Sequence, residues 1–222
     1  MSIFLNANNQ IRRLARPLAH TLRDRKRLAT IDKEIGKLLP KLKEYHFDEK
    51  DISIDLGANR GDFSVWLLER GCFVIGLEPH PEAFQYFAKR VGSNKNILKI
   101  QAAISNKTSL GKVFVHPDAR QDQLGFSIRA SIKQEKPGFI PYSKTLSIDI
   151  HQLFQAIERV TVLKVDIEGS ELEIWEEIKK NATKIKFLLM EVHDVINPNL
   201  RKEIESFILH KRLESHWTVN WI

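Results

Sequence analysis

From residue 51 onward, short apolar runs alternate with segments of helical periodicity, and this alternation constrains the fold more than any other feature. The runs predicted as strands are five to eight residues long and lie at 52–56, 72–77, 97–104, 160–165 and 186–192. Helices are predicted between and after them, at 63–68, 82–90, 171–180 and 200–213. Strands separated by helices favour a parallel sheet that is covered on both faces. We therefore predict an α/β fold with a doubly wound, mostly parallel sheet.

The stretch 105–145 departs from this pattern because it contains three glycines and three prolines. We predict irregular structure there, with one additional strand at 112–116. A final short strand is predicted at 217–222. With 222 residues, of which 42% are hydrophobic, the chain is large enough for one domain with a sizeable core.

The excess positive charge of the chain lies in its first 45 residues. They hold 11 Lys and Arg against 4 Asp and Glu, whereas residues 46–222 hold 24 of each sign. Leucine and isoleucine recur there at steps of three and four, which indicates amphipathic helix, with Pro17 and Pro40 at helix ends or kinks. We predict a basic amphipathic helical segment at 1–45 and an α/β domain at 46–222. The segment either packs its leucine face on the domain or contacts a polyanion or an acidic membrane surface peripherally.

Composition excludes several classes of protein. No run approaches the roughly 18 uninterrupted apolar residues of a membrane-spanning helix. The single cysteine, Cys72, rules out a disulfide framework and a multi-cysteine metal site. The first twenty residues are too polar for a secretory signal. Together these features predict a cytoplasmic protein.

A glycine-containing loop, DLGANRGDFS, begins at Asp55 and ends the first predicted strand. Ligands of open α/β sheets bind at the carboxyl ends of the strands. Gly57 and Gly61 allow the backbone to turn tightly and to approach a ligand, and Asp55 could accept hydrogen bonds from the loop or from a ligand. Asn59 stands where a dinucleotide-binding loop, G-x-G-x-x-G, has its middle glycine, which disfavours NAD and flavins.

Glu78 follows the second predicted strand, 21 residues beyond Gly57. A carboxylate at this position is suited to the two hydroxyl groups of an adenosine ribose. A nucleoside ligand without a pyrophosphate-binding loop indicates S-adenosylmethionine (SAM).

Six motifs, in chain order, carry a family resemblance: DLGANRGDFS, GLEPHPEAF, QAAIS, SIDIHQLF, LKVDIEGSELEIW and MEVH. Over about residues 50–195 the chain resembles the FkbM-type family of SAM-dependent methyltransferases, and the segment KVDIEGSE followed by a strand ending in E-x-H is the most specific part. The resemblance implies a Rossmann-like class I methyltransferase fold and methyl transfer to hydroxyls of sugars, glycans or natural products. That fold ends in an antiparallel hairpin, which would be short or incomplete in this chain.

The family pattern also implies a set of cofactor contacts. These are Asp55, Gly57, Ala58, Asn59, Gly61 and Ser64 around the first loop, Glu78 at the ribose, Pro79, His80, Ala103 and Ser105 beside the adenine, and Asp166 at the sulfonium.

Four ionisable groups are predicted to meet at one rim of the sheet, because two follow the fourth predicted strand and two end the fifth. They are the candidate catalytic residues Asp166, Glu168, Glu191 and His193. A sugar hydroxyl needs a base to take its proton, and we predict His193 or Asp166 in this role. The same rim could hold a divalent cation. Asp166 could instead cap the following helix, with Glu168 as a favourable charge near its N-terminus.

These observations favour a SAM-dependent O-methyltransferase that acts on a small-molecule or glycan hydroxyl. Two alternatives stay open: an RNA ribose methyltransferase, suggested by the basic N-terminal segment, and a non-catalytic SAM-binding docking protein. Nucleic acid is not favoured as a partner, because no nucleic-acid-binding motif is present and Lys164 lies inside its strand, without an evident lysine-based catalytic set. The oligomeric state is left open.

Overall fold

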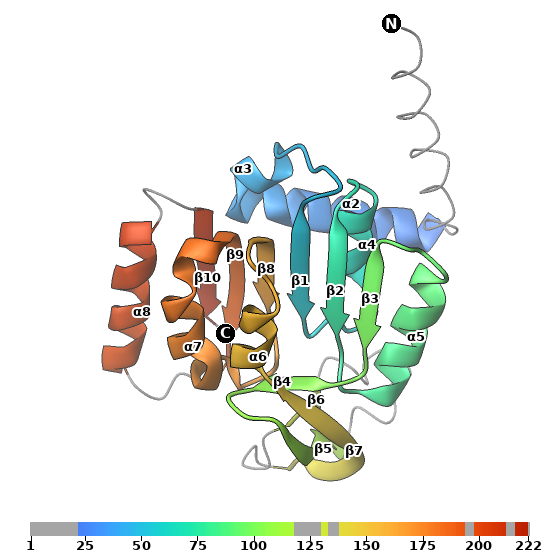
Figure 1. Cartoon of the computed structure of the whole chain (residues 1–222). Helices are drawn as coiled ribbons and strands as arrows, with labels where there is room; N and C mark the ends of the chain where they lie inside the picture. Colours follow the sequence, from blue (N-terminus) through green and yellow to red (C-terminus); the bar gives the residue numbers. More distant parts are fainter. Residues whose placement is uncertain (1–21, 118–129, 133–137, 194–197, 212–215, 222) are drawn as a thin grey trace, which may run out of the picture.

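The computed structural model describes residues 22–117, 130–132, 138–193, 198–211 and 216–221 (Figure 1). Its centre is a six-stranded sheet in the order β10-β9-β8-β1-β2-β3, and every pairing in this sheet is parallel. Its strands are β1 (Ile52–Leu56), β2 (Phe73–Leu77), β3 (Ile97–Ile100), β8 (Val160–Val165), β9 (Ile185–Val192) and β10 (His216–Trp221). The predicted α/β class with a parallel sheet is confirmed.

Helices cover both faces of this sheet, as a doubly wound fold requires (Figure 1). One face carries α2 (Leu22–Leu38), α3 (Pro40–Lys43), α4 (Asp62–Leu68) and α5 (Pro81–Val91). The other carries α6 (Ile150–Gln155), α7 (Glu171–Lys180) and α8 (Pro198–Lys211), and a 3-10 turn, η2 (Ala182–Lys184), leads into β9. Val74 and Ile75 of β2 belong to different hydrophobic cores, because successive side chains of a strand point to opposite faces.

The described part of the basic segment packs on the sheet. Leu28 and Ile35 of α2 are buried in the same core as Trp66 of α4. Asp32 accepts a 2.6 Å hydrogen bond from Nη2 of Arg70. The Arg70 guanidinium in turn lies 3.7 Å from the centre of the Trp66 ring. The leucine face of the segment therefore contributes to the domain core.

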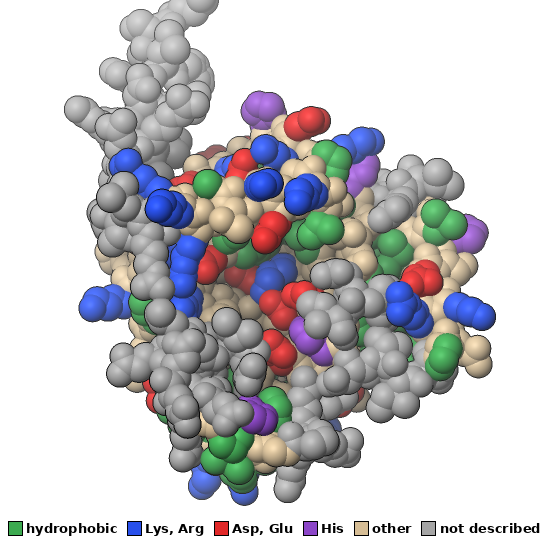
Figure 2. Space-filling view, turned by 180° about the vertical axis from the view of Figure 1, so that it is seen from behind, with side chains coloured by type: hydrophobic (Ala, Val, Ile, Leu, Met, Phe, Trp, Pro, Cys, Tyr) green, Lys and Arg blue, Asp and Glu red, His purple; other side chains and the backbone are tan. Residues whose placement is uncertain are grey.

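Basic side chains from the described part of this segment lie on the surface, in the upper part of the face that Figure 2 shows. Those exposed to solvent are Arg25, Lys26, Lys33, Lys37, Lys41 and Lys43. Helix α2 ends two residues before Pro40, which begins α3, whereas Pro17 lies outside the described residues. In the described part of the chain, no helix has the length and apolar character needed to cross a membrane.

Four strands between Ala103 and Asp149 build a second sheet within the region where irregular structure was predicted. Its strands, in the order β4-β7-β5-β6, are β4 (Ala103–Ser105), β5 (Ser109–Val115), β6 (Ala130–Ser131) and β7 (Ile140–Asp149). The single strand predicted at 97–104 is therefore wrong, since β3 ends at Ile100 and β4 belongs to the second sheet. The predicted strand 112–116 overlaps β5, which begins three residues earlier and ends one residue earlier.

A β-bulge explains how this sheet accommodates proline. Phe114 of β5 pairs with Pro141 and Val113 pairs with Ser143, which leaves Tyr142 as an extra residue in β7. Bulges of this kind bend a strand and redirect a side chain. The Tyr142 ring stacks on His80 with 5.0 Å between ring centres, so the second sheet packs against the loop after β2.

Strand β10 adds to the large sheet in parallel, beside β9. It lies where the short final strand was predicted, one residue earlier. Among the described residues no antiparallel strand pairs with the large sheet, so the hairpin implied by the family resemblance is not found there.

Candidate functional site

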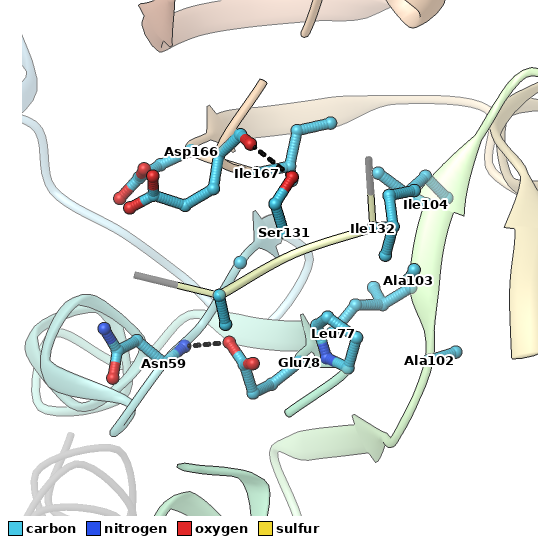
Figure 3. Close-up of a pocket in the computed structure, with 14 residues that line it drawn as sticks. Asn59, Leu77, Glu78, Ala102, Ala103, Ile104, Ser131, Ile132, Asp166 and Ile167 are labelled. Atoms are coloured by element: carbon cyan, nitrogen blue, oxygen red, sulfur yellow. Dashed lines mark hydrogen bonds between the residues drawn. The ribbon is translucent and has the colours of Figure 1, made fainter. Parts of the chain in front are cut away.

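A cavity opens at the carboxyl ends of the large sheet, where the chain order reverses between β1 and β8. This switch point is where open α/β sheets bind ligands. Loops after β1, β2 and β8 line one side, and residues of the second sheet line the other (Figure 3). The lining residues are Gly57, Asn59, Leu77, Glu78, Pro79, Ala102, Ala103, Ile104, Ala130, Ser131, Ile132, Asp166, Ile167 and Glu168.

The loop after β1 lies close against its two neighbouring strands. The N–H groups of Gly57 and Ala58 both donate to the carbonyl oxygen of Leu77, at 3.0 and 2.8 Å. Gly57 has a φ of +75°, and a Cβ on it would lie 1.8 Å from the backbone oxygen of Asp166. Glycine alone fits this conformation and this close approach. Gly57 therefore allows the loop to pack against the end of β8.

Glu78 presents a rigidly held carboxylate to the cavity (Figure 3). Its Oε2 accepts a hydrogen bond from the N–H of Asn59 at 2.7 Å, and its Oε1 accepts one from the N–H of His80 at 2.8 Å. Burial raises the pKa of Glu78 to about 7, although the two N–H groups and Lys164 act in the opposite direction. Each oxygen retains a lone pair for a hydroxyl group of a ligand.

Small apolar side chains line the cavity beside Glu78. Ala102 and Ala103 lie at the turn from β3 into β4, and Ile132 lies near Ile104 from the second sheet (Figure 3). Ligand sites commonly combine such an apolar wall with a few fixed polar groups. This part of the cavity suits a flat purine ring.

Six of the predicted cofactor residues line the cavity: Gly57, Asn59, Glu78, Pro79, Ala103 and Asp166. The other six are not among its lining residues and lie behind its wall: Asp55, Ala58, Gly61, Ser64, His80 and Ser105. Ser64 is fully buried and donates a 2.6 Å hydrogen bond to Oδ2 of Asp55. A Cβ on Gly61 would lie 2.2 Å from the Phe87 ring, so this glycine permits the packing of α4 against α5.

The other residues behind the wall also have local structural contacts. Ala58 is buried in the core of the α2–α5 face. His80 is fully buried, and its Nδ1 accepts a hydrogen bond from the N–H of Ala83 at the start of α5. Ser105 donates to the carbonyl oxygen of Lys107 at 2.8 Å. These residues shape the site.

Lys164 belongs to the site, although its position inside a predicted strand gave no indication of this. Its Nζ lies 3.3 Å from Oδ1 of Asp55 and 3.3 Å from Oδ2 of Asp166, and it donates to the carbonyl oxygen of Gly57 at 2.7 Å. Burial lowers the pKa of Lys164, but the two carboxylates outweigh burial and the net shift is upward. The two-residue period of a strand, which places 164 and 166 on one face, is the signal that could have identified it.

The start of α7 argues against one of the two predicted roles of Asp166, that of a helix cap. The residue that precedes α7 as its N-cap is Ser170, not Asp166. Asp166 lines the cavity and is about 30% exposed, so its carboxylate is available to a ligand.

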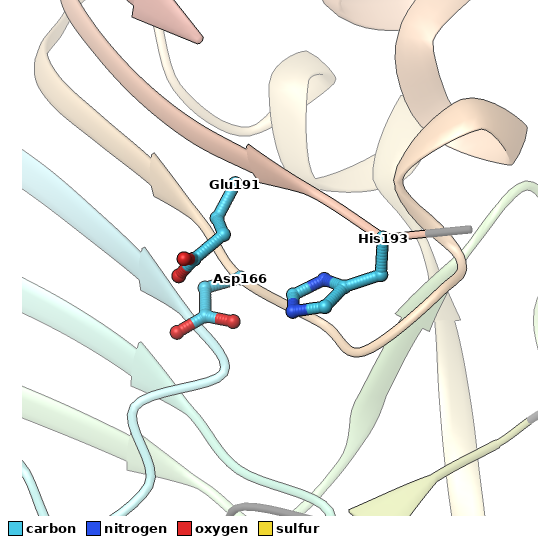
Figure 4. A group of neighbouring side chains, drawn as sticks. All are labelled: Asp166, Glu191 and His193. Carbon is cyan, nitrogen blue, oxygen red and sulfur yellow. The ribbon is translucent and has the colours of Figure 1, made fainter. Parts of the chain in front are cut away.

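Asp166, Glu191 and His193 come together at the ends of β8 and β9 (Figure 4). One donor atom from each lies within 4.8 Å of the other two. Nε2 of His193 is also 3.7 Å from Oε2 of Glu168, so the four rim residues share one small region. Acidic side chains and a histidine gather in the hollow at the centre of Figure 2.

Glu171, the first residue of α7, orients His193. Its Oε1 lies 3.0 Å from Nδ1 of His193, and the carboxylate also accepts the N–H groups of Ile167 and Gly169, at 3.2 and 3.0 Å. The hydrogen bond to Glu171 raises the pKa of His193 to about 9 against the effect of burial. Without a cation at the rim, this pKa favours the protonated ring at neutral pH, which argues against His193 as the base. The rim carboxylates are the better proton acceptors.

Glu168 has a strained backbone. Its φ of 57° is unusual for a residue other than glycine and costs of order 1 kcal/mol. Its carbonyl oxygen accepts a 2.8 Å hydrogen bond from Ser131 of β6, so the second sheet contacts the strained turn directly.

A parallel sheet with helices on both faces and a cavity at its switch point places this protein in the doubly wound class of α/β proteins, which bind ligands at that edge. The sequence profile described as "Methyltransferase FkbM domain" matches residues 55–214. This chain belongs to the FkbM methyltransferase family.

Two known proteins show the range of the similarity. The chain is 22% identical over 172 residues to the hexuronic acid methyltransferase AglP of Haloferax volcanii, covering 77% of this chain and 66% of that protein. It is also similar to the crystal structure of Methyltransferase FkbM from Methylobacillus flagellatus KT, with 16% identity and a TM-score of 0.39. That match covers 61% of this chain and 31% of the other. This chain thus spans only part of either protein.

Gly57→Ala tests the close contact between the first loop and β8. We expect it to lower the free energy of unfolding by at least about 2 kcal/mol, because the added methyl group combines an unfavourable φ with a clash against backbone. Urea denaturation followed by circular dichroism measures the change.

Gly111→Ala is the matched control, because a Cβ at Gly111 meets nothing within 4 Å. It should change stability by no more than about 0.5 kcal/mol. Equal effects of the two substitutions would contradict the described position of the loop.

Proposed function

We propose that this protein transfers a methyl group from SAM to a hydroxyl group of a sugar or glycan, on a Rossmann-like class I methyltransferase domain. The observation that carries the proposal is the Glu78 carboxylate, held at the cavity wall by the N–H groups of Asn59 and His80. This geometry suits the adjacent hydroxyls of a ribose. Membership in a methyltransferase family supplies the reaction class.

The other lining residues fit the remaining parts of SAM. Ala102, Ala103 and Ile132 would accommodate the adenine, and the methionine part would lie along the loop at Gly57 and Asn59. When bound, SAM supplies an electrophilic methyl group on a positively charged sulfur. The carboxylate of Asp166 at this side of the cavity favours a cation electrostatically.

The polar rim beside Asp166 is the proposed acceptor site. Glu168, Glu191 and His193 offer both acceptors and donors to sugar hydroxyls, and a rim carboxylate would take the hydroxyl proton. A positioned base accelerates such a step by about 10²–10⁴-fold. The relative described as a hexuronic acid methyltransferase supports a sugar as the acceptor class.

Neither alternative function gains support from the described residues. Lys164 is held between Asp55 and Asp166 with a raised pKa, and a charged lysine is not a proton acceptor for an RNA ribose hydroxyl. A non-catalytic docking protein would bind the cofactor without turnover, and the acceptor experiment below distinguishes it.

Calorimetric titration with S-adenosylhomocysteine (SAH) tests the cofactor. Glu78→Ala should weaken binding at least tenfold at pH 8, because two ribose hydroxyls lose a charged acceptor. Glu203→Ala removes a carboxylate of α8 that is about half exposed and pairs with Lys179, and it should leave the affinity unchanged. NAD should not bind.

The affinity should also depend on pH through Glu78. Its pKa is about 7 in place of the usual 4.5, so the protonated form dominates below pH 7 and must lose its proton to accept two ribose hydroxyls. SAH affinity of the wild type should therefore fall about tenfold from pH 8 to pH 6. Glu78→Ala should show no such change. A wild-type affinity that is equal at both pH values and insensitive to Glu78→Ala would exclude Glu78 as the ribose ligand.

Transfer of a radioactive methyl group from SAM tests the acceptor. The wild type should label glycans that contain hexuronic acid at least tenfold faster than Glu78→Ala does. A neutral glycan and an RNA transcript serve as comparison acceptors. Labelling of RNA alone would establish the ribose alternative. SAH binding without labelling of any acceptor would favour the docking protein.

A further inference from the structure

Two adjacent strand ends place three metal-ligating side chains around one point. Val165 pairs with Met190 in the β8–β9 ladder, so Asp166 and Glu191 follow at neighbouring positions. His193 lies two residues beyond Glu191, which places it on the same face of the chain. The three side chains converge in Figure 4, and their donor atoms lie within 4.8 Å of one another.

We infer that Asp166, Glu191 and His193 form a binding site for a divalent metal ion. Two ligand atoms at about 2.0–2.2 Å from one metal ion lie at most about 4.4 Å apart. The three donor atoms lie within 4.8 Å of one another, so small rotations of the partly exposed side chains can bring them into this range.

The orientation of His193 supports the metal site independently of Asp166 and Glu191. Glu171 is fully buried and accepts from Nδ1 of His193 at 3.0 Å, which leaves Nε2 on the side of the rim. Histidines that bind metals commonly hydrogen-bond a carboxylate through their other ring nitrogen, which fixes the ring and the tautomer. Glu171 is itself held by the N–H groups of Ile167 and Gly169.

The negative charge of the rim favours a multivalent cation. Asp166, Glu168, Glu171 and Glu191 surround the ligand positions, and Lys164 is shared with the buried Asp55. Two carboxylates with one imidazole suit Mn²⁺ or Mg²⁺ among the divalent ions. Three protein ligands leave coordination positions for water and for an oxygen of the acceptor.

The role of this ion rests on the proposed O-methyl transfer. A hydroxyl bound to a divalent ion has a lowered pKa. Its proton would pass to the carboxylate of Glu168, its oxygen would form the bond to the methyl carbon, and the electron pair of the broken sulfur–carbon bond would return to sulfur, giving SAH. Glu168 suits this role because it lies beside the three ligands without being one of them.

Titration of the full chain with Mn²⁺, followed by the electron paramagnetic resonance signal of the free ion, tests the site. We expect saturable binding of one ion by the wild type. Glu191→Gln should weaken it at least tenfold. Glu171→Gln leaves the three ligands in place but changes the carboxylate that supports His193 and the N–H groups of Ile167 and Gly169, and it should weaken Mn²⁺ binding by about 10–100-fold. Glu203→Gln is the control and should bind as the wild type does.

SAH titration of the same samples keeps the two proposals separate. Glu191 and Glu171 do not line the nucleoside cavity, so variants that retain SAH binding are folded. Normal SAH binding with no bound Mn²⁺ at millimolar concentration, or with Mn²⁺ binding unchanged in Glu191→Gln, would overturn the metal site and leave the proposed function standing. A wild type that does not bind SAH would instead overturn the proposed function.

Discussion

The arrangement of the site depends on the contacts of the Lys164 ammonium group. It joins Asp55 at the end of β1 to Asp166 after β8, and it donates to the carbonyl oxygen of Gly57 between them. Breaking a buried ion pair by removing one partner commonly costs about 3–5 kcal/mol, because the other charge is left buried. Asp55 is fully buried, so this lysine keeps the two strand ends and the first loop in register.

The second sheet completes the site from the opposite side. Ser131 of β6 bonds the carbonyl oxygen of Glu168 at the strained turn, and the bulge in β7 places Tyr142 on His80. The cavity therefore has one wall from the parallel sheet, which carries the fixed carboxylates, and one from the smaller sheet. The cavity lies between these two layers (Figure 3).

Local signals predicted the large sheet and, as cofactor contacts, six of the fourteen residues that line the cavity, because strand period, glycine loops and the position of Glu78 are encoded within a few residues. The second sheet was missed because its pairings are distant in sequence, Ala103 with Ser147 for example, and because Pro141 is accommodated by a bulge. Lys164 and Glu171 were missed for a related reason. Each is a common residue in its own element, and its role comes from partners on other elements.

A crystal structure of the chain with SAH tests the central claim most directly. The account predicts both ribose hydroxyls within hydrogen-bonding distance of Glu78, the adenine between Ala103 and Ile132, and the sulfur on the side of Asp166. SAH bound outside this cavity, or with its ribose turned away from Glu78, would contradict the account.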